Sequence, residues 1–132
     1  MSSLSLMQLY KILFVCMGNI CRSPAAEAVM KRLIEDEGLT KQIKCDSAGT
    51  ISYHTGDSPD PRMHTAAENR NIKTEGYARQ INKNDYKNFN LILTMDEDNY
   101  KNVLSMAPPK NFSAEIKKFC NFINAPSKTE IP

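Results

Sequence analysis

Residues 11–24 read KILFVCMGNICRSP, and this stretch decides the fold. The apolar run from Ile12 to Val15 is rich in β-forming residues, which predicts a short strand buried on both faces, as in a parallel sheet. Ser23 and Pro24 are typical of a helix start, with serine at the N-cap and proline at the first helical position. The stretch therefore predicts a strand, a turn over 17–22 and a helix.

Strands and helices alternate along the rest of the chain. Apolar residues recur at helical spacing after Pro24, and Gly38 is a natural stop for that helix. The apolar positions are Ala26, Val29, Met30, Leu33 and Ile34. The later predicted elements are a strand over 43–50, a helix from Asp60 to about Asn69, a short helix within 79–89, a strand over 90–95, a helix over 96–106, and a segment over 114–123 that suits either strand or helix. This alternation predicts an α/β domain around a parallel sheet.

Composition narrows the function classes. The 132 residues suit one domain with one core, residues 1–10 are expected to be an N-terminal extension without signal-peptide features, and no apolar run is long enough to span a membrane. A net charge of +2, mixed along the chain, argues against nucleic-acid or membrane partners. The four cysteines form no pair of CxxC units, so we expect no metal site and no cofactor. Without a secretion signal, they favour reduced thiols in the cytoplasm.

The turn after the first strand carries the chemistry. Cys16 stands where the strand ends, which is where α/β folds bind ligands. Gly18 and Asn19 tolerate positive φ, so the loop can turn its N–H groups inward around an anion, and Arg22 can hold two oxygens of that anion. The same positive environment, with the Ser23 hydroxyl, favours the thiolate form of Cys16. One loop would bind a tetrahedral oxyanion and aim a nucleophile at it, which predicts phosphoryl transfer through a phosphocysteine.

Weaker patterns need the same scrutiny. A cysteine with an arginine six positions on is not specific by itself, and a buried cysteine at a strand end is usually a packing residue. Here the apolar strand, Gly18, Asn19 and the Ser-Pro pair stand in register with it, which favours the catalytic interpretation. His54 and His64 stand in no catalytic motif, and Cys45 and Cys120 are expected in the core. His54 is expected in a loop near the site, and His64 on a helix surface.

The segments ILFVCMGNICRSPAAEAV, CDSAGT, DPRM, ARQI and LILTMDEDN together resemble the low-molecular-weight protein tyrosine phosphatases. The resemblance covers residues 11–132, and its first segment is long and specific. It implies a single three-layer α/β domain with a four-stranded parallel sheet and helices on both faces. It also implies metal-independent hydrolysis of phosphotyrosine in proteins or of small aryl phosphates, with inorganic phosphate or a similar oxyanion in the loop.

The resemblance also implies roles for individual residues. Cys16 matches the nucleophile, Arg22 the phosphate-gripping arginine, and Ser23 the serine that supports the thiolate. Asn19 matches the asparagine that holds the loop in shape, and Cys21 the cysteine that can form a protective disulfide with Cys16. The positions assigned to phosphate or substrate binding are Met17, Gly18, Asn19, Ile20, Cys21, Arg22 and Tyr53, of which Met17, Ile20 and Tyr53 line the substrate slot.

Two features depart from the family pattern. Gly76 stands where members often have a histidine bonded to the loop asparagine, so support for Asn19 must come from elsewhere. The family's general acid is an aspartate in an Asp-Pro-aromatic motif near the C-terminus, and this sequence ends KTEIP, which resembles the segment just before it. We therefore expect the C-terminal part of the 11–132 domain to be missing. Glu130 is the nearest acid within the sequence, in the wrong motif context.

Three other functions stay open at this point. Arsenate reduction would use the same loop, but it needs further cysteines for a disulfide relay, and no cysteine lies between Cys45 and Cys120. Phosphoarginine hydrolysis is found in relatives that carry threonine at the position of Ile20, so isoleucine favours the tyrosine type. A non-catalytic phosphate-binding module would fit a chain that lacks its general acid.

Overall fold

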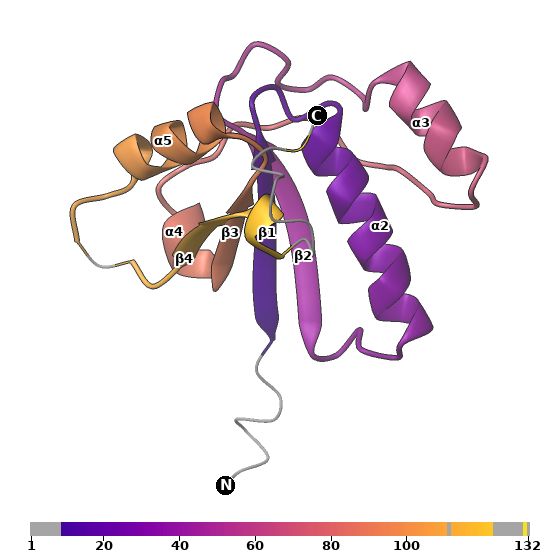
Figure 1. The fold of residues 1–132 in the computed structure, drawn as a ribbon, viewed down its shortest axis with the longest axis horizontal. Helices are drawn as coiled ribbons and strands as arrows, with labels where there is room; N and C mark the ends of the chain where they lie inside the picture. Colours follow the sequence, from indigo (N-terminus) through magenta and orange to yellow (C-terminus); the bar gives the residue numbers. More distant parts are fainter. Residues whose placement is uncertain (1–8, 111, 123–130, 132) are drawn as a thin grey trace, which may run out of the picture.

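The computed structural model describes residues 9–110, 112–122 and 131 (Figure 1). Strands and helices alternate along it, as the sequence predicts. In chain order the elements are β1 (Tyr10–Cys16), α2 (Arg22–Asp36), β2 (Ile43–Gly49), α3 (Pro61–Glu68), α4 (Asp85–Asn88), β3 (Leu91–Thr94), α5 (Glu97–Met106), β4 (Glu115–Lys118) and a 3-10 helix (Phe119–Phe122).

The four strands form one parallel sheet in the order β2-β1-β3-β4. β1 lies inside the sheet, and its register sets Cys16 opposite Gly49 of β2 and Val15 opposite Thr94 of β3. The carboxyl ends of these strands meet at one edge, which lies at the top of the sheet in Figure 1, beside the start of α2. This edge is where α/β sheets bind ligands.

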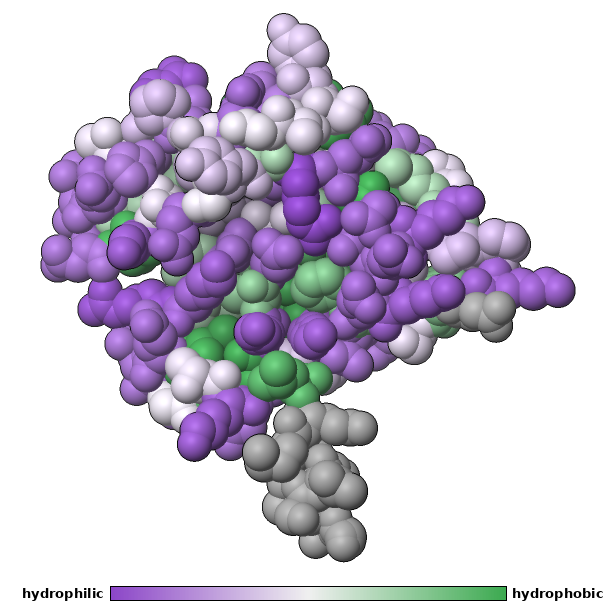
Figure 2. Space-filling view, turned by 180° about the vertical axis from the view of Figure 1, so that it is seen from behind, coloured by the Kyte–Doolittle hydropathy of each residue, from purple (hydrophilic) through white to green (hydrophobic). Residues whose placement is uncertain are grey.

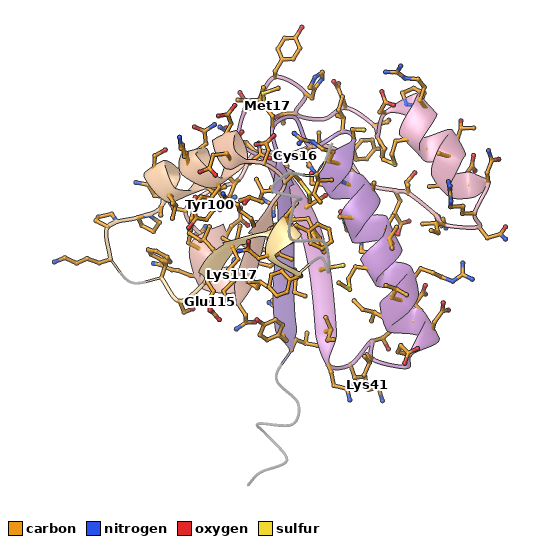
Figure 3. The ribbon with its side chains drawn as sticks, viewed as in Figure 1. Cys16, Met17, Lys41, Tyr100, Glu115 and Lys117 are labelled. Atoms are coloured by element: carbon orange, nitrogen blue, oxygen red, sulfur yellow. The ribbon has the colours of Figure 1, made fainter. Side chains whose placement is uncertain are left out.

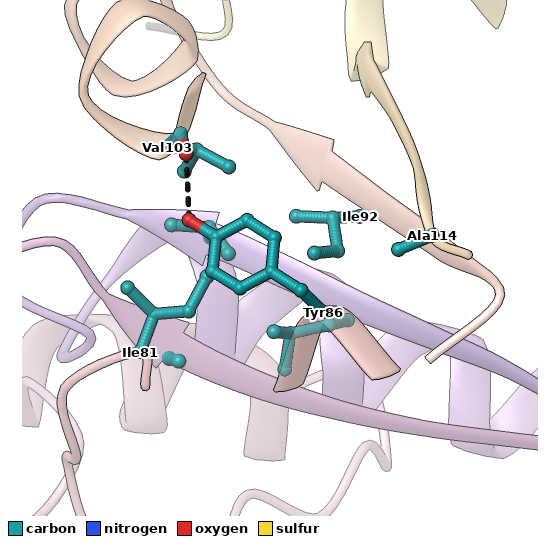
Figure 4. Close-up of a cluster of buried hydrophobic side chains, with 8 residues drawn as sticks. Ile81, Tyr86, Ile92, Val103 and Ala114 are labelled. Carbon is teal, nitrogen blue, oxygen red and sulfur yellow. Dashed lines mark hydrogen bonds between the residues drawn. The ribbon is translucent and has the colours of Figure 1, made fainter. Parts of the chain in front are cut away.

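Side chains of β1 alternate between two apolar clusters, one on each face of the sheet. Val15 packs in the cluster that holds Tyr86 of α4 and Val103 of α5 (Figure 4). Its neighbour Phe14 packs on the other face, where Met30 of α2 joins the cluster. Helices therefore cover both faces of the sheet, which confirms the predicted sandwich.

The start of α2 differs from the prediction. Its N-cap residue is Cys21, which makes no side-chain capping bond, and Ser23 lies inside the helix. Ser23 is fully buried and turned to the β1 end instead, so the prediction that it caps the helix was wrong. The predicted apolar face was only partly right, because Ile34 is buried whereas Val29 and Leu33 are 43% and 52% exposed.

Other boundaries follow their local signals. Asp60 caps α3 by accepting from the backbone N–H groups of Arg62 and Met63, and Asp96 caps α5. The ambiguous segment over 114–123 contains β4 and then the 3-10 helix. Tyr10, the last residue of the predicted N-terminal extension, is the first residue of β1. Residues 1–8 of that extension and Glu130 lie outside the described residues.

Figure 2 shows the molecule from behind, where hydrophilic residues cover most of this face and hydrophobic ones show between them at the centre and lower part of the view. A hollow of about 1000 Å³ lies beside β2 and α2, and no residue of the 17–21 loop lines it. None of the helices in the described part of the chain is long and apolar enough to span a membrane.

Candidate active site

Cys16 is the last residue of β1, at the point where the buried strand opens into the loop before α2 (Figure 3). Its residue is only 4% exposed. The loop over 17–21 then leads into α2, whose first turn carries Arg22 and Ser23. The predicted order of strand, turn and helix therefore brings a thiol and the positive end of a helix to one place.

Two groups converge on the sulfur of Cys16. The backbone N–H of Asn19 donates to Sγ at 3.3 Å, and Ser23 Oγ lies 3.0 Å from it. Because Ser23 Oγ already accepts from Asn19 Nδ2 at 2.9 Å, its proton is available to the sulfur. Ala48 O is the other acceptor in reach, at the longer distance of 3.4 Å. Donors to sulfur favour the charged form, as the sequence predicts for this loop.

Asn19 gives the loop its shape. Its φ of 59° places it in the left-handed region, and its side chain is buried and bonded at both ends. Nδ2 donates to Ser23, and Oδ1 accepts from the backbone N–H of Arg79 at 2.9 Å. Gly18 does not have a positive φ, so backbone freedom is not the reason for a glycine at this position. A Cβ there would lie 2.8 Å from the ring of His54, and glycine lets that ring pack on the loop.

Arg22 reaches across to the far side of the loop. Its Nη1 donates to Asp96 Oδ2 at 2.9 Å and to the carbonyl oxygen of Ile131 at 3.0 Å. Asp96 also accepts from the N–H of Asn99 at 2.7 Å as the cap of α5. Asp96 therefore faces the site, and the residue that caps α5 also orients the arginine.

The second loop cysteine, Cys21, is exposed, whereas Cys16 is buried, and both are free thiols. Burial, followed by the charges of Asp60 and Cys16, raises the pKa of the Cys21 thiol above its ordinary value. Two cysteines of different character therefore border one loop. Cys45 lies away from the loop, and burial followed by the charge of Glu27 raises the pKa of its thiol to about 11.

The residues expected to line a substrate slot lie at the surface. Met17 is 55% exposed and Tyr53 is 82% exposed, with the Tyr53 ring edge-on to His54 at 4.8 Å between ring centroids. Ile20 is half-buried, and its carbonyl oxygen accepts from the N–H of Asp60. His54 is a loop residue beside the site, as expected.

Sequence reasoning missed two residues that shape the loop from behind. Gly49 ends β2 directly against it, and a Cβ at this position would lie 2.6 Å from the carbonyl oxygen of Met17. Arg79 supplies the backbone N–H that supports Asn19. The family resemblance gives this supporting role to a histidine at the position that Gly76 occupies here. Gly49 and Arg79 both stand in segments that carry the family resemblance, CDSAGT and ARQI, which is the signal that marks them.

The described residues contain no group of three or more His, Cys, Asp or Glu side chains that could hold a metal ion. Metal-independent catalysis remains a prediction from the sequence.

Comparison with known proteins gives the family. The family model for low molecular weight phosphotyrosine protein phosphatases matches residues 11–132. The chain belongs to this family. A family relative, the low molecular weight phosphotyrosine protein phosphatase of Schizosaccharomyces pombe, is 42% identical over 110 residues, covering 83% of this chain and 70% of the relative.

Solved structures share the fold. A crystal structure of a protein tyrosine phosphatase from Entamoeba histolytica, with Hepes in the active site, is 45% identical with a TM-score of 0.86. It covers 93% of this chain and 78% of its own. A Drosophila arginine phosphatase is 34% identical with a TM-score of 0.79, covering 82% of this chain and 69% of its own. The phosphatase fold predicted from the sequence is thus confirmed.

Proposed function

We propose that this chain hydrolyses phosphotyrosine without a metal, through a phosphocysteine intermediate on Cys16. The observation that carries the proposal is the buried Sγ of Cys16, which meets the Asn19 N–H at 3.3 Å and Ser23 Oγ at 3.0 Å at the strand end. A thiolate held by donors at the start of a helix is a nucleophile placed in an anion site. Membership of the phosphatase family supports the same conclusion.

The loop would bind the phosphoryl group before reaction. Backbone N–H groups over 17–21 and the N-terminus of α2 offer donors to its oxygens, and Arg22 adds a charged, planar pair of donors. The Entamoeba relative, with Hepes in its active site, supports this, because Hepes carries a tetrahedral sulfonate. Met17, Ile20 and Tyr53 would offer apolar contacts to the aromatic ring of the substrate.

The reaction would proceed in two displacements at phosphorus. In the first, the Cys16 thiolate forms the S–P bond while the P–O bond to the tyrosine oxygen breaks, and the leaving phenolate takes a proton. In the second, water attacks the phosphocysteine, the S–P bond breaks, and inorganic phosphate leaves with the thiolate restored. Arg22 and the loop N–H groups stabilise the charge on the equatorial oxygens in both steps.

Asp96 is not assigned as the donor of the leaving-group proton. One of its oxygens accepts from Arg22 and the other caps α5, so its carboxylate is engaged in holding the arginine. Its proposed role is to orient Arg22.

Rapid-mixing kinetics with p-nitrophenyl phosphate tests the proposal. We expect a burst of p-nitrophenol equal to the active enzyme, and a covalent phosphate on Cys16 after acid quenching. Cys16→Ser should abolish both. Cys45→Ser is the matched control, because burial raises the pKa of Cys45 to about 11 and it should not act as a nucleophile. Phosphate binding with no burst and no phosphoenzyme would leave a non-catalytic binding module instead.

Phosphoarginine is the second candidate substrate, and the likeness to the Drosophila arginine phosphatase favours testing it. Ile20, with an apolar side chain beside the loop, favours a flat aromatic ring over a charged guanidinium group. We expect phosphotyrosine peptides to be cleaved faster than phosphoarginine peptides, and Ile20→Thr to narrow the ratio. Faster cleavage of phosphoarginine by the wild type would reverse the assignment.

A cytoplasmic location stays a prediction from the cysteines.

A further inference from the structure

The phosphate-binding loop depends on a residue outside it. Asn19 has a left-handed backbone, which asparagine tolerates better than most residues with a side chain and which bonds from its surroundings stabilise further. Its side chain is tied to Ser23 on one side and to the Arg79 N–H on the other, both at 2.9 Å. The position of the Arg79 backbone therefore sets the position of the loop.

The Arg79 backbone also ties down the end of β2. Its carbonyl oxygen accepts from the N–H of Gly49 at 2.8 Å, and the Ile81 N–H donates back to Gly49 at 2.8 Å. Gly49 in turn lies against the loop, with Met17 and Asn19 next to it. One residue thus holds the loop by its N–H and the strand end behind the loop by its carbonyl.

The side chain of Arg79 gives this backbone a further anchor. Its guanidinium binds both oxygens of Asp85 at 2.9 and 3.1 Å, and it binds Asp46 at 3.1 Å. Asp85 is 4% exposed and stands beside Tyr86, which is buried in the core and bonded to Val103 (Figure 4). The anchor is therefore rigid and half-buried, unlike an ordinary surface ion pair.

Gly76 has no side chain that could support Asn19 in place of the Arg79 N–H. Gly76 has open space around it, and a hollow of about 240 Å³ lies between it, Asn19 and Arg79. Among the contacts of the described residues, the donor to Asn19 Oδ1 is the Arg79 N–H.

We propose that Arg79 is a positioning residue of this phosphatase, acting through its ion pairs with Asp85 and Asp46 to hold Asn19 and the anion-binding shape of the loop. The inference rests on the proposed function for its substrate, but phosphate binding alone can test it.

The test compares Arg79→Lys, Arg79→Ala and Asp85→Asn with the wild type. The readout is protection of Cys16 from iodoacetate by inorganic phosphate, measured together with the pH dependence of labelling. We expect the phosphate concentration for half-protection to rise about 10- to 100-fold in Arg79→Ala, with a smaller rise in Arg79→Lys, which keeps the charge but loses the bidentate geometry. The labelling rate near neutral pH should fall, because a loose loop no longer holds the donors on the sulfur.

Controls separate positioning from folding. Arg70→Lys alters an exposed arginine whose guanidinium donates to Ala66 O at 3.4 Å, and it should leave protection unchanged. Asp46→Asn removes the more exposed carboxylate and should give an intermediate effect in a chain that folds. Effects of Arg79→Lys and Asp85→Asn should be far from additive, since they break one interaction.

Unchanged protection and labelling in folded Arg79→Ala would overturn the inference. So would losses that match the unfolded fraction by circular dichroism, because they would show a merely structural role. A wild type that binds phosphate but forms no phosphoenzyme would refute the proposed function and leave this test intact.

Discussion

Gly49 shows how far one hydrogen atom in place of a side chain can decide a site. Its backbone is not in the left-handed region, so alanine is acceptable to its φ and ψ. The obstacle is space, because a Cβ would lie 2.6 Å from Met17 O and 3.1 Å from the Gly18 carbonyl carbon. Backbone atoms cannot rotate out of the way as a side chain can, so the loop itself must move.

We therefore predict that Gly49→Ala weakens phosphate protection of Cys16 about tenfold or more, since a small misplacement of a catalytic loop is costly. The measurement is iodoacetate labelling with increasing phosphate. Gly38→Ala is the control: its φ of 69° makes it strained, but open space surrounds it and it follows α2 far from the loop. It should cost about 1 kcal/mol of stability and leave labelling unchanged. Equal protection in both variants would contradict the prediction.

A second prediction concerns Cys21. Peroxide should oxidise the Cys16 thiolate to a sulfenic acid, and the Cys21 sulfur should then attack it, forming a disulfide with loss of water. The raised pKa of Cys21 keeps it a thiol while Cys16 reacts first. Dithiothreitol should restore activity to the oxidised wild type, but much less to Cys21→Ser, where sulfinic acid accumulates. Mass spectrometry that finds sulfinic acid on Cys16 and no 16–21 link in the wild type would refute this, and Cys45→Ser is the control.

At the scale of single elements, Asp96 joins two tasks at the start of α5. It caps the helix through Asn99 N–H and orients Arg22. Asp96→Ala should lower the free energy of unfolding by about 1 kcal/mol, because the cap is lost, whereas Asp96→Asn should keep most of it, since asparagine caps helices as well as aspartate does. Both variants should weaken phosphate protection of Cys16, because Arg22 loses a charged partner.

Thermal melts and the protection assay measure the two tasks separately. Asp60→Ala, at the N-cap of α3, is the matched control for a lost cap that leaves the bond between Asp96 and Arg22 in place. If Asp96→Asn binds phosphate as the wild type does, the carboxylate charge does not hold Arg22 in place.

Element boundaries differ in how well the sequence predicts them, and the reason is physical. The starts of α3 and α5 depend on an aspartate that bonds within three residues, so a local pattern is sufficient. The start of α2 does not, because Ser23 is taken by the distant partner at the end of β1 and by Ala48 of β2. Capping rules treat serine as free to bond its own helix, and here a tertiary contact takes precedence.

The same distinction applies to the site. Four site residues lie within eight positions of one another in the sequence: Cys16, Asn19, Arg22 and Ser23. Their spacing alone was therefore enough to predict that they share one site. Arg79 lies 60 positions from Asn19 in the sequence. Arg79 itself belongs to no helix or strand. The group that bonds Asn19 is a backbone N–H, which carries no residue-specific pattern, so the ARQI segment marks the position but the contact emerges only from the structure.

At the scale of the whole molecule, Tyr86 couples the core to alkaline pH. It is 1% exposed, its hydroxyl donates to Val103 O at 2.6 Å, and burial, followed by the charge of Asp85, raises its pKa from 10 to about 12. A raised pKa means that the folded state holds the proton more tightly than the unfolded state. The resulting stability is complete below pH 10 and is lost as pH rises from 10 to about 12.

Tyr86→Phe isolates this contribution. At pH 8 the variant should be less stable by about 1–3 kcal/mol, because Val103 O loses its buried partner. Between pH 10 and 12 the wild type should lose up to about 3 kcal/mol that the variant does not, so the two unfolding free energies should converge. Cys45, whose thiol pKa is raised to about 11, also titrates in this range, but it does so in both proteins and cancels in the difference. Urea unfolding at pH 8, 10 and 11 measures it, with Tyr77→Phe, at a 75% exposed site, as the control that should match the wild type at every pH. A stability difference between Tyr86→Phe and the wild type that stays constant from pH 8 to 11 would mean that the Tyr86 proton is held no more tightly in the folded state than in the unfolded one.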